Sequence, residues 1–337
     1  MTIMLATLAL VILAASQDAP AQLTAVPFAP HDSPVVALQA GRKGKRLFSM
    51  TEAGVVAEWS EKKSTTLWHS KADTFAEENP DAGAIHLSVG DEAATRSTPG
   101  PFLAYELVGL ADGTVGRRGS APVSPASLNT QVSVGAIVTD PKDKWVWLGG
   151  SDGALVRLML DNPLTGWSTR GVKNGGVTAM ALDSKAKEIA IGGEDGTIRF
   201  IGNSSCDVDE KAVFEGHDSP VGSVVWDPSG KTIVSADRKG QIRIHNRRSG
   251  KTVRMLAAPG RKLQCLVVHP KGKWLAAGAE DGSIHVWTVK DGALIATCNI
   301  ADAQGGVTAM CFLKDGKTLF AAAGKSLHRI ELKDVGK

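Results

Sequence analysis

Several common features are scarce in this chain of 337 residues. Aromatic residues make up only 5% of it, no segment shows a convincing helical period, and the net charge is +3. A helical repeat is therefore not expected, and the charge is too small to predict a nucleic-acid partner. Cysteine is rare too, with no CxxC pair and no metal-ligand spacing, so buried free thiols and disulfides both remain open. The four cysteines are Cys206, Cys265, Cys298 and Cys311.

Long apolar runs are nearly absent. The one candidate, residues 3–15, is shorter than the roughly 20 residues of a membrane-spanning helix, so no membrane span is expected. Small residues follow this run, as they do in a signal peptide, although no Lys or Arg precedes it. We therefore predict a signal peptide over residues 1–21, a single domain over residues 22–337, and a secreted or periplasmic location. The alternative is a buried N-terminal strand or helix.

Enzyme signatures are missing as well. The sequence has no P-loop, no GxGxxG after a strand, no HExxH and no GxSxG. We therefore predict no catalytic residues, no cofactor and no metal site. Most of the eight histidines fall at equivalent places in an internal repeat, which favours an architectural role.

What the chain does contain is a repeat marked by glycine. Strings such as GEDGTIRFI and AEDGSIHVW share a polar turn, a glycine and an alternating strand. The glycines recur at intervals of 59, 40, 43, 44 and 42 residues, and Lys325 stands 43 residues after the last of them. A tight hairpin turn needs a residue that tolerates positive φ, so each glycine predicts a turn. These glycines are Gly54, Gly113, Gly153, Gly196, Gly240 and Gly282.

Each repeat carries short apolar strands around its turn. Runs such as 188–191 and 274–277 precede the turn, another strand lies ahead of each across a polar hairpin, and a fourth strand follows in several copies. Four antiparallel strands in about 43 residues fit a propeller blade.

The repeat resembles the WD-repeat β-propeller family. Gly216–His217 matches the dipeptide that opens a family repeat, and Trp287–Thr288 and Trp59–Ser60 stand where the family has Trp-Asp. In the family, a turn Asp, a His, a strand Ser or Thr and the Trp form a hydrogen-bonded tetrad. The resemblance implies such structural roles for Asp112, Asp152, Asp195, Asp281, His217, Ser235, Trp59 and Trp287.

No copy of the tetrad is complete in the sequence. The repeat with His217 and Ser235 has Lys239 in place of the turn Asp and His245 in place of the Trp. The next repeat keeps Asp281 but lacks the His. These departures concern the hydrogen-bond network rather than the fold.

Seven turn positions predict an all-β, seven-bladed β-propeller of four-stranded antiparallel blades. Too few residues follow the last repeat to form its fourth strand. The segment AVPFAPHDSPV at 25–35 parallels AVFEGHDSPV at 212–221. We therefore predict that the N-terminal strand 23–28 completes the last blade and closes the ring, with Pro27 tolerated at an outer edge.

The expected function is a non-catalytic protein-interaction scaffold. The family's usual peptide-docking surface is the channel mouth, near an extra acidic loop at 71–83, and there we predict another protein or peptide as partner. The predicted contact residues are Glu52, Asp73, Glu77, Glu78 and Asp81.

Loops on the opposite face carry more basic than acidic residues, which predicts an anionic partner. The alternative is that lysines in such hairpins only keep the turns soluble. No aromatic residues are interleaved with these charges, so no nucleic acid is expected. The basic set includes Arg42, Lys43, Lys45 and Arg46.

Two other functions remain open. One is an exported propeller enzyme, such as a lactonase-like hydrolase or a cofactor-dependent dehydrogenase. The other is an intracellular WD-repeat scaffold whose N-terminus is not a signal peptide.

Overall fold

The described part of the chain contains strands but no helix. The computed structural model describes residues 20–40, 46–52, 56–60, 63–70, 84–89, 106–110, 115–117, 134–139, 145–159, 166–209, 212–257, 261–301 and 303–332. The predicted signal peptide therefore lies outside these ranges, except for Pro20 and Ala21. Within them, no helix is long and apolar enough to cross a bilayer.

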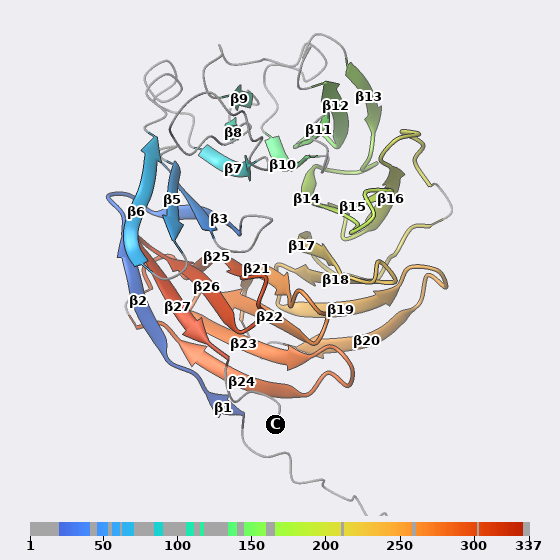
Figure 1. The fold of residues 1–337 in the computed structure, drawn as a ribbon. Coiled ribbons are helices and arrows are strands. Elements are labelled where there is room, and N and C mark those ends of the chain that lie inside the picture. The colour runs from blue at the N-terminus through green and yellow to red at the C-terminus, as the bar shows by residue number, and fades with distance from the viewer. Residues whose placement is uncertain are drawn as a thin grey trace, which may run out of the picture.

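Strand pairing divides the described strands into seven sheets arranged around a ring (Figure 1). The first three sheets are β3 (Val35–Ala40), β4 (Arg46–Thr51), β5 (Val56–Ser60) and β6 (Lys63–Ser70); β7 (Ala84–Val89), β8 (Glu106–Leu110) and β9 (Val115–Arg117); and β10 (Val134–Thr139), β11 (Trp145–Gly150), β12 (Ala154–Met159) and β13 (Gly166–Arg170). The next two are β14 (Val177–Leu182), β15 (Glu188–Gly193) and β16 (Ile198–Gly202); and β17 (Val221–Trp226), β18 (Thr232–Asp237), β19 (Gln241–Asn246) and β20 (Thr252–Ala257). The last two are β21 (Leu263–Val268), β22 (Trp274–Ala279), β23 (Ser283–Thr288) and β24 (Leu294–Asn299), joined by β1 (Ala21–Gln22); and β25 (Val307–Phe312), β26 (Thr318–Ala323) and β27 (Ser326–Glu331), joined by β2 (Ala25–Pro30).

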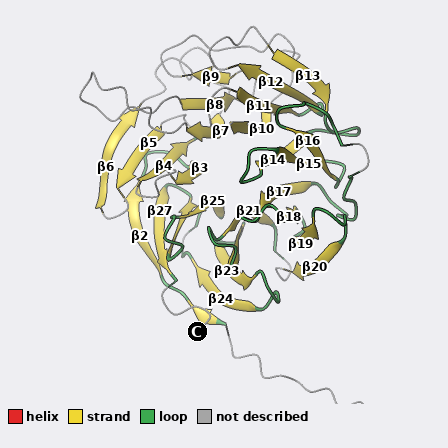
Figure 2. Cartoon of the chain, turned by 45° about the vertical axis from the view of Figure 1, so that its right-hand side comes forward, coloured by secondary structure: helices red, strands yellow, loops and turns green. Residues whose placement is uncertain are grey.

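The sheets follow one another around a central axis, as Figure 2 shows from a second direction. The first strand of each sheet is innermost: β3, β7, β10, β14, β17, β21 and β25 follow in order, and β25 returns to β3. The predicted all-β propeller architecture is confirmed. Side chains are described in six of the sheets. Those of β7–β9 lie outside the described set, so the count of seven blades stays a prediction.

The N-terminal strand lies on the last sheet. β2 pairs antiparallel with β27, from Ala25 opposite Ile330 to Pro30 opposite Ser326. The register shifts between Pro27 and Ala29, at the residue that lacks an amide hydrogen. The strand begins two residues later than predicted. A further strand was not predicted at all: β1 pairs parallel with β24 as a fifth strand of the neighbouring sheet.

The expectation of four strands in every blade is wrong for the sheet β14–β16. In place of a fourth strand, single bridges join β16 to the described residues of 203–209 and 212–214: Ile198 pairs with Phe214, and Ile201 pairs with Val208. The string NSSCDVDE is polar and lacks the alternation of a strand, and Cys206 has a positive φ of 60°. The local sequence therefore favours an irregular loop.

Apolar cores lie between neighbouring sheets. Phe200 and Phe214 pack with Trp226 and Ile233 between the sheets β14–β16 and β17–β20. The turns beside these cores leave little room: at Gly196, with φ of +75°, a Cβ would lie 2.5 Å from the His217 carbonyl oxygen. The predicted need for glycine in the turns thus has a steric basis here.

Candidate functional site

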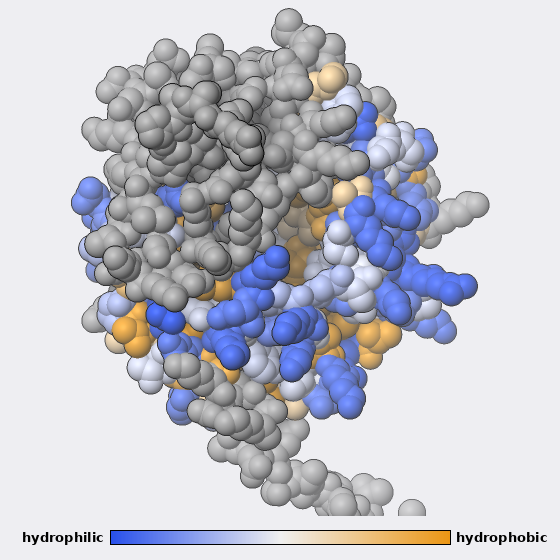
Figure 3. Space-filling view, viewed as in Figure 1, coloured by the Kyte–Doolittle hydropathy of each residue, from blue (hydrophilic) through white to orange (hydrophobic). Residues whose placement is uncertain are grey.

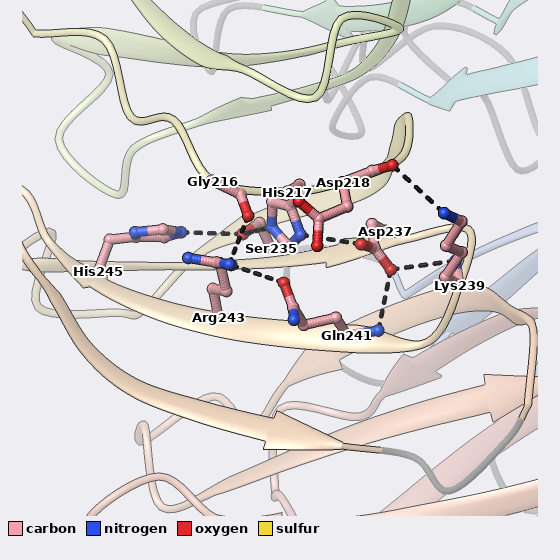
Figure 4. A network of polar contacts seen from close by, with 9 residues as sticks. All are labelled: Gly216, His217, Asp218, Ser235, Asp237, Lys239, Gln241, Arg243 and His245. Carbon is pink, nitrogen blue, oxygen red and sulfur yellow. Dashed lines mark hydrogen bonds and ion pairs between the residues drawn. The ribbon is translucent and has the colours of Figure 1, made fainter.

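A buried polar network joins the strands of the sheet β17–β20 (Figure 4). His217 Nε2, just before β17, lies 2.8 Å from Ser235 Oγ on β18, and His245 Nε2 on β19 lies 3.0 Å from the same oxygen. All three side chains are buried. The structure therefore brings His217 and Ser235 together as the resemblance implies, with His245 in the place of the Trp.

The carboxylate of this network is Asp237, which sequence reasoning missed. Its Oδ2 lies 3.3 Å from His217 Nδ1, and its Oδ1 accepts the backbone amides of Lys239 (3.0 Å) and Gln241 (2.9 Å). Asp237 lies two residues ahead of the expected turn position, which Lys239 occupies. Its role depends on the tertiary contact between the end of β18 and His217.

Ser235, His217 and Asp237 have the order of contacts found in a catalytic triad, but they are enclosed. The three residues are 0%, 8% and 2% exposed, and Ser235 Oγ is shared with a second histidine. Burial lowers the pKa of His217, and burial together with nearby His217 and Arg243 lowers the pKa of His245 to about 4. Both imidazoles are therefore neutral at neutral pH. A nucleophile needs access to its substrate, so this arrangement suits a structural network.

The sheet β3–β6 contains a second network of the same kind. Trp59 Nε1 donates to Ser49 Oγ at 2.7 Å, and the same oxygen lies 3.1 Å from His31 Nε2. Sequence reasoning predicted Trp59 but missed Ser49 and His31, although His31 stands in the first copy of the HDSP string. Trp287, by contrast, stacks on His285 with ring centroids 5.7 Å apart.

The predicted turn aspartates hold their own turns. Asp152, Asp195 and Asp281 each accept the backbone amide of the second residue along the chain, at 2.9, 3.0 and 3.0 Å. Such contacts stabilise the turn locally. Asp112 lies outside the described residues.

Glu52 belongs to a set of exposed glutamates at the end of the molecule where second strands turn into third strands. Its amide donates to the Pro34 carbonyl at 2.8 Å, and the amides of Glu194 and Glu280 make the equivalent bonds in two other sheets at 2.9 and 3.0 Å. All three residues are exposed. Sequence reasoning missed Glu194 and Glu280, although each stands two residues before a turn glycine, as Glu52 does. The other predicted acidic residues, Asp73, Glu77, Glu78 and Asp81, lie outside the described ranges.

The side chains of the four predicted basic residues lie outside the described part of the chain. Arg42, Lys43 and Lys45 lie outside the described ranges, and Arg46 begins β4 with its side chain also outside them. On the face drawn in Figure 3, hydrophilic residues gather over the sheets β17–β20 and β21–β24.

No metal site is formed by the residues that the structure describes: nowhere among them do three or more His, Cys, Asp or Glu side chains gather to hold an ion. The four cysteines are free. Burial raises the pKa of the Cys265 and Cys311 thiols to about 12.

The match to a known family lies in the C-terminal half of the chain. Residues 209–246 and 250–288 match the family described as WD domain, G-beta repeat. A stretch of 124 residues is 32% identical to the Periodic tryptophan protein 2 homolog of Dictyostelium discoideum and covers 35% of this chain and 13% of that protein. The U3 small nucleolar RNA-associated protein 4 homolog of Mus musculus is 26% identical over 160 residues, 48% of this chain and 23% of that protein. The Ribosome biogenesis protein ERB1 of Ajellomyces capsulatus is 34% identical over 70 residues, 20% of this chain and 9% of that protein.

These relatives correct one prediction. The expectation of a secreted or periplasmic location is wrong, because relatives are named for ribosome biogenesis and for association with a small nucleolar RNA. The chain spans less than a quarter of the length of each of these three relatives.

Proposed function

Because this chain belongs to the WD-repeat β-propeller family, we propose that it is an intracellular, non-catalytic scaffold that holds protein partners. Of the functions considered from the sequence, the alternative of an intracellular WD-repeat scaffold has better support than the exported one. Two of the relatives are named for association with a small nucleolar RNA and for ribosome biogenesis.

A rigid ring supports this role. In the proposal, all seven sheets act as blades, and β2 on β27 closes the ring by joining the N-terminal strand to the last sheet. A closed ring presents turn residues from many sheets at fixed mutual positions, which is what a surface for protein partners requires.

The observation that carries the proposal is the repeated position of Glu52, Glu194 and Glu280. These three exposed glutamates, whose amides make the same backbone bond in three sheets, place negative charge at this end of the propeller. In the sheet β17–β20 the same bond is made by the exposed Arg238, and the Glu280 carboxylate lies 3.5 Å from Lys262 Nζ. We propose that this end, the channel mouth, docks a protein or peptide with basic residues. Asp73, Glu77, Glu78 and Asp81 belong to the same proposed surface.

The test is a triple variant, Glu52→Gln, Glu194→Gln and Glu280→Gln, expressed in place of the native chain in its own cells. The amide keeps the size of each side chain but removes its charge. Proteins crosslinked to the wild-type chain should be lost from the triple variant and retained by Asp207→Asn, which removes an exposed carboxylate elsewhere. Equal recovery from all three chains would overturn the proposed surface, and the absence of any specific partner would overturn the scaffold.

A further inference from the structure

A cavity of about 540 Å³ lies at the opposite end of the strands from Glu194. It is formed where β15 begins, where β18 begins and where β19 ends, so it lies between the sheets β14–β16 and β17–β20. Three of its six lining residues are basic; the lining consists of Glu188, Gly230, Lys231, Asn246, Arg247 and Arg248.

One wall of this cavity is fixed. Arg247 donates through Nε and Nη2 to the two carboxylate oxygens of Glu188, at 3.1 and 2.9 Å, and through Nη2 to Asp209 Oδ2 at 3.0 Å. Its guanidinium also lies 4.1 Å from the centre of the Phe200 ring. Two carboxylates thus neutralise Arg247, and the same contacts tie the two sheets together. The Arg247 guanidinium is therefore held in place as part of the cavity wall and is not available to bind a ligand.

The free charges of the cavity are Lys231 and Arg248. Both side chains are exposed, and neither forms a hydrogen bond or an ion pair with the described residues. Asn246 Oδ1 accepts the Ser249 amide at 2.9 Å. Its side-chain nitrogen forms no hydrogen bond with the residues that the structure describes. The cavity therefore offers two cations and one neutral donor.

The nearby aspartates keep their negative charge, but their oxygens accept backbone amides of their own hairpins. Asp183 accepts the backbone amides of Lys185, Lys187 and Glu188. Asp227 likewise accepts the amides of Ser229, Lys231 and Thr232. A short aspartate can turn back on its own hairpin, whereas a long lysine side chain extends outward. The exposed side chains of Lys231 and Arg248 are therefore the charged groups of this cavity that can extend to a ligand.

The chemistry of the lining favours carboxylate over nucleic acid. A single-stranded nucleic acid needs aromatic faces for its bases. The aromatic ring beside the cavity, Phe200, is fully buried beneath Arg247. Lysine and arginine form strong, charge-assisted hydrogen bonds with carboxylates.

We propose that this cavity binds an acidic segment of a partner protein, with an Asp or Glu side chain held between Lys231 and Arg248. The inference rests on the proposed scaffold function and adds a second surface to it.

The test uses the full chain and a fluorescent peptide of ten glutamates, with a ten-glutamine peptide as the uncharged control. The double variant Lys231→Ala, Arg248→Ala should weaken binding about tenfold or more in fluorescence anisotropy, because two charge-assisted hydrogen bonds are lost. The matched control is Lys314→Ala, Lys317→Ala, which removes two exposed lysines from the equivalent hairpin of the sheet β25–β27. Its affinity should change less than about twofold. Thermal unfolding should be the same for both variants.

Three outcomes would overturn the inference. Equal weakening by the two double variants would mean diffuse attraction to a basic face. Tighter binding of a ten-nucleotide single-stranded RNA, lost in Lys231→Ala, Arg248→Ala, would make the site one for nucleic acid. No binding of the glutamate peptide would remove the site. If that last result came with intact crosslinking at Glu52, Glu194 and Glu280, only the cavity would be refuted, and the scaffold would stand.

Discussion

Asp237 Oδ2 lies 3.3 Å from His217 Nδ1, although the position where the family has its aspartate holds Lys239. The carboxylate is supplied from the end of β18 instead of from the turn that follows it. Asp237 also accepts two backbone amides of that turn. The same carboxylate therefore caps the turn and pairs with His217.

Replacement of Asp237 by Ala should therefore destabilise the fold. The loss leaves two turn amides and a buried imidazole without an acceptor, and we expect a decrease of about 3 kcal/mol in the free energy of unfolding. Asp237→Asn should cost less, since its carbonyl oxygen can still accept an amide. Urea unfolding measures both. The control Asp207→Ala, at an exposed site, should stay within about 0.5 kcal/mol of wild type; an equally small effect of Asp237→Ala would contradict the role.

Stability should decrease as the solution is acidified. Burial lowers the pKa of His217, His269, His285 and His328, and that of His245 to about 4. An imidazole in the unfolded chain titrates near 6.5, so between pH 6.5 and 4 the unfolded chain binds protons that the folded chain does not. Stability is thus fully present above about pH 6.5 and is lost toward pH 4. For His245 alone the loss is on the order of 3 kcal/mol.

His245→Gln tests the assignment, because glutamine keeps polar atoms near Ser235 and does not titrate. Thermal unfolding measured from pH 7 to pH 4 should show a shallower loss of stability for this variant than for wild type. Identical slopes would mean that His245 does not carry the proton uptake.

Removal of β2 should weaken the propeller. A chain that starts at His31 loses the pairing with β27 and the contacts of Phe28 with Phe320 and Trp59, whose ring centroids lie 5.0 and 6.3 Å away. It also leaves the edge of β27 open to other chains. We expect a loss of about 3 kcal/mol or more and a tendency to associate. A chain that starts at Pro20 keeps every described residue and is the control; light scattering and thermal unfolding of the two chains should differ clearly.

The cysteines should not react in the native protein. All four are free, and burial raises the pKa of each thiol, to about 12 for Cys265 and Cys311. A thiol reagent acts on the thiolate, so at pH 8 the folded chain should take up little label, and the chain in denaturant should take up four equivalents. A count below four in denaturant without reductant would reveal a disulfide.

Much of the architecture could be predicted because short stretches of sequence determine its strands and turns. The spacing of Gly153, Gly196, Gly240 and Gly282 marks one turn per repeat, and alternating apolar residues mark the strands around it. The same logic placed the N-terminal strand on β27 to within two residues. It failed at residues 203–214, where a strand was expected by analogy with other repeats although the local string is polar.

The candidate surfaces were harder to predict, since they combine residues from different repeats. Glu194 and Glu280 could have been found by aligning them with Glu52. The cavity could not, because Glu188, Lys231 and Arg248 meet only when two neighbouring sheets pack.

The sequence by itself determined the repeat, the strands and the turns, because hydrophobic alternation and the need for positive φ act over a few residues. Only the tertiary structure decided which polar groups meet: Asp237 with His217, Arg247 with Glu188 and Asp209, and the unpaired Lys231 beside Arg248. Buried polar atoms must find partners wherever packing brings them, and packing between sheets is a property of the whole ring rather than of any one repeat.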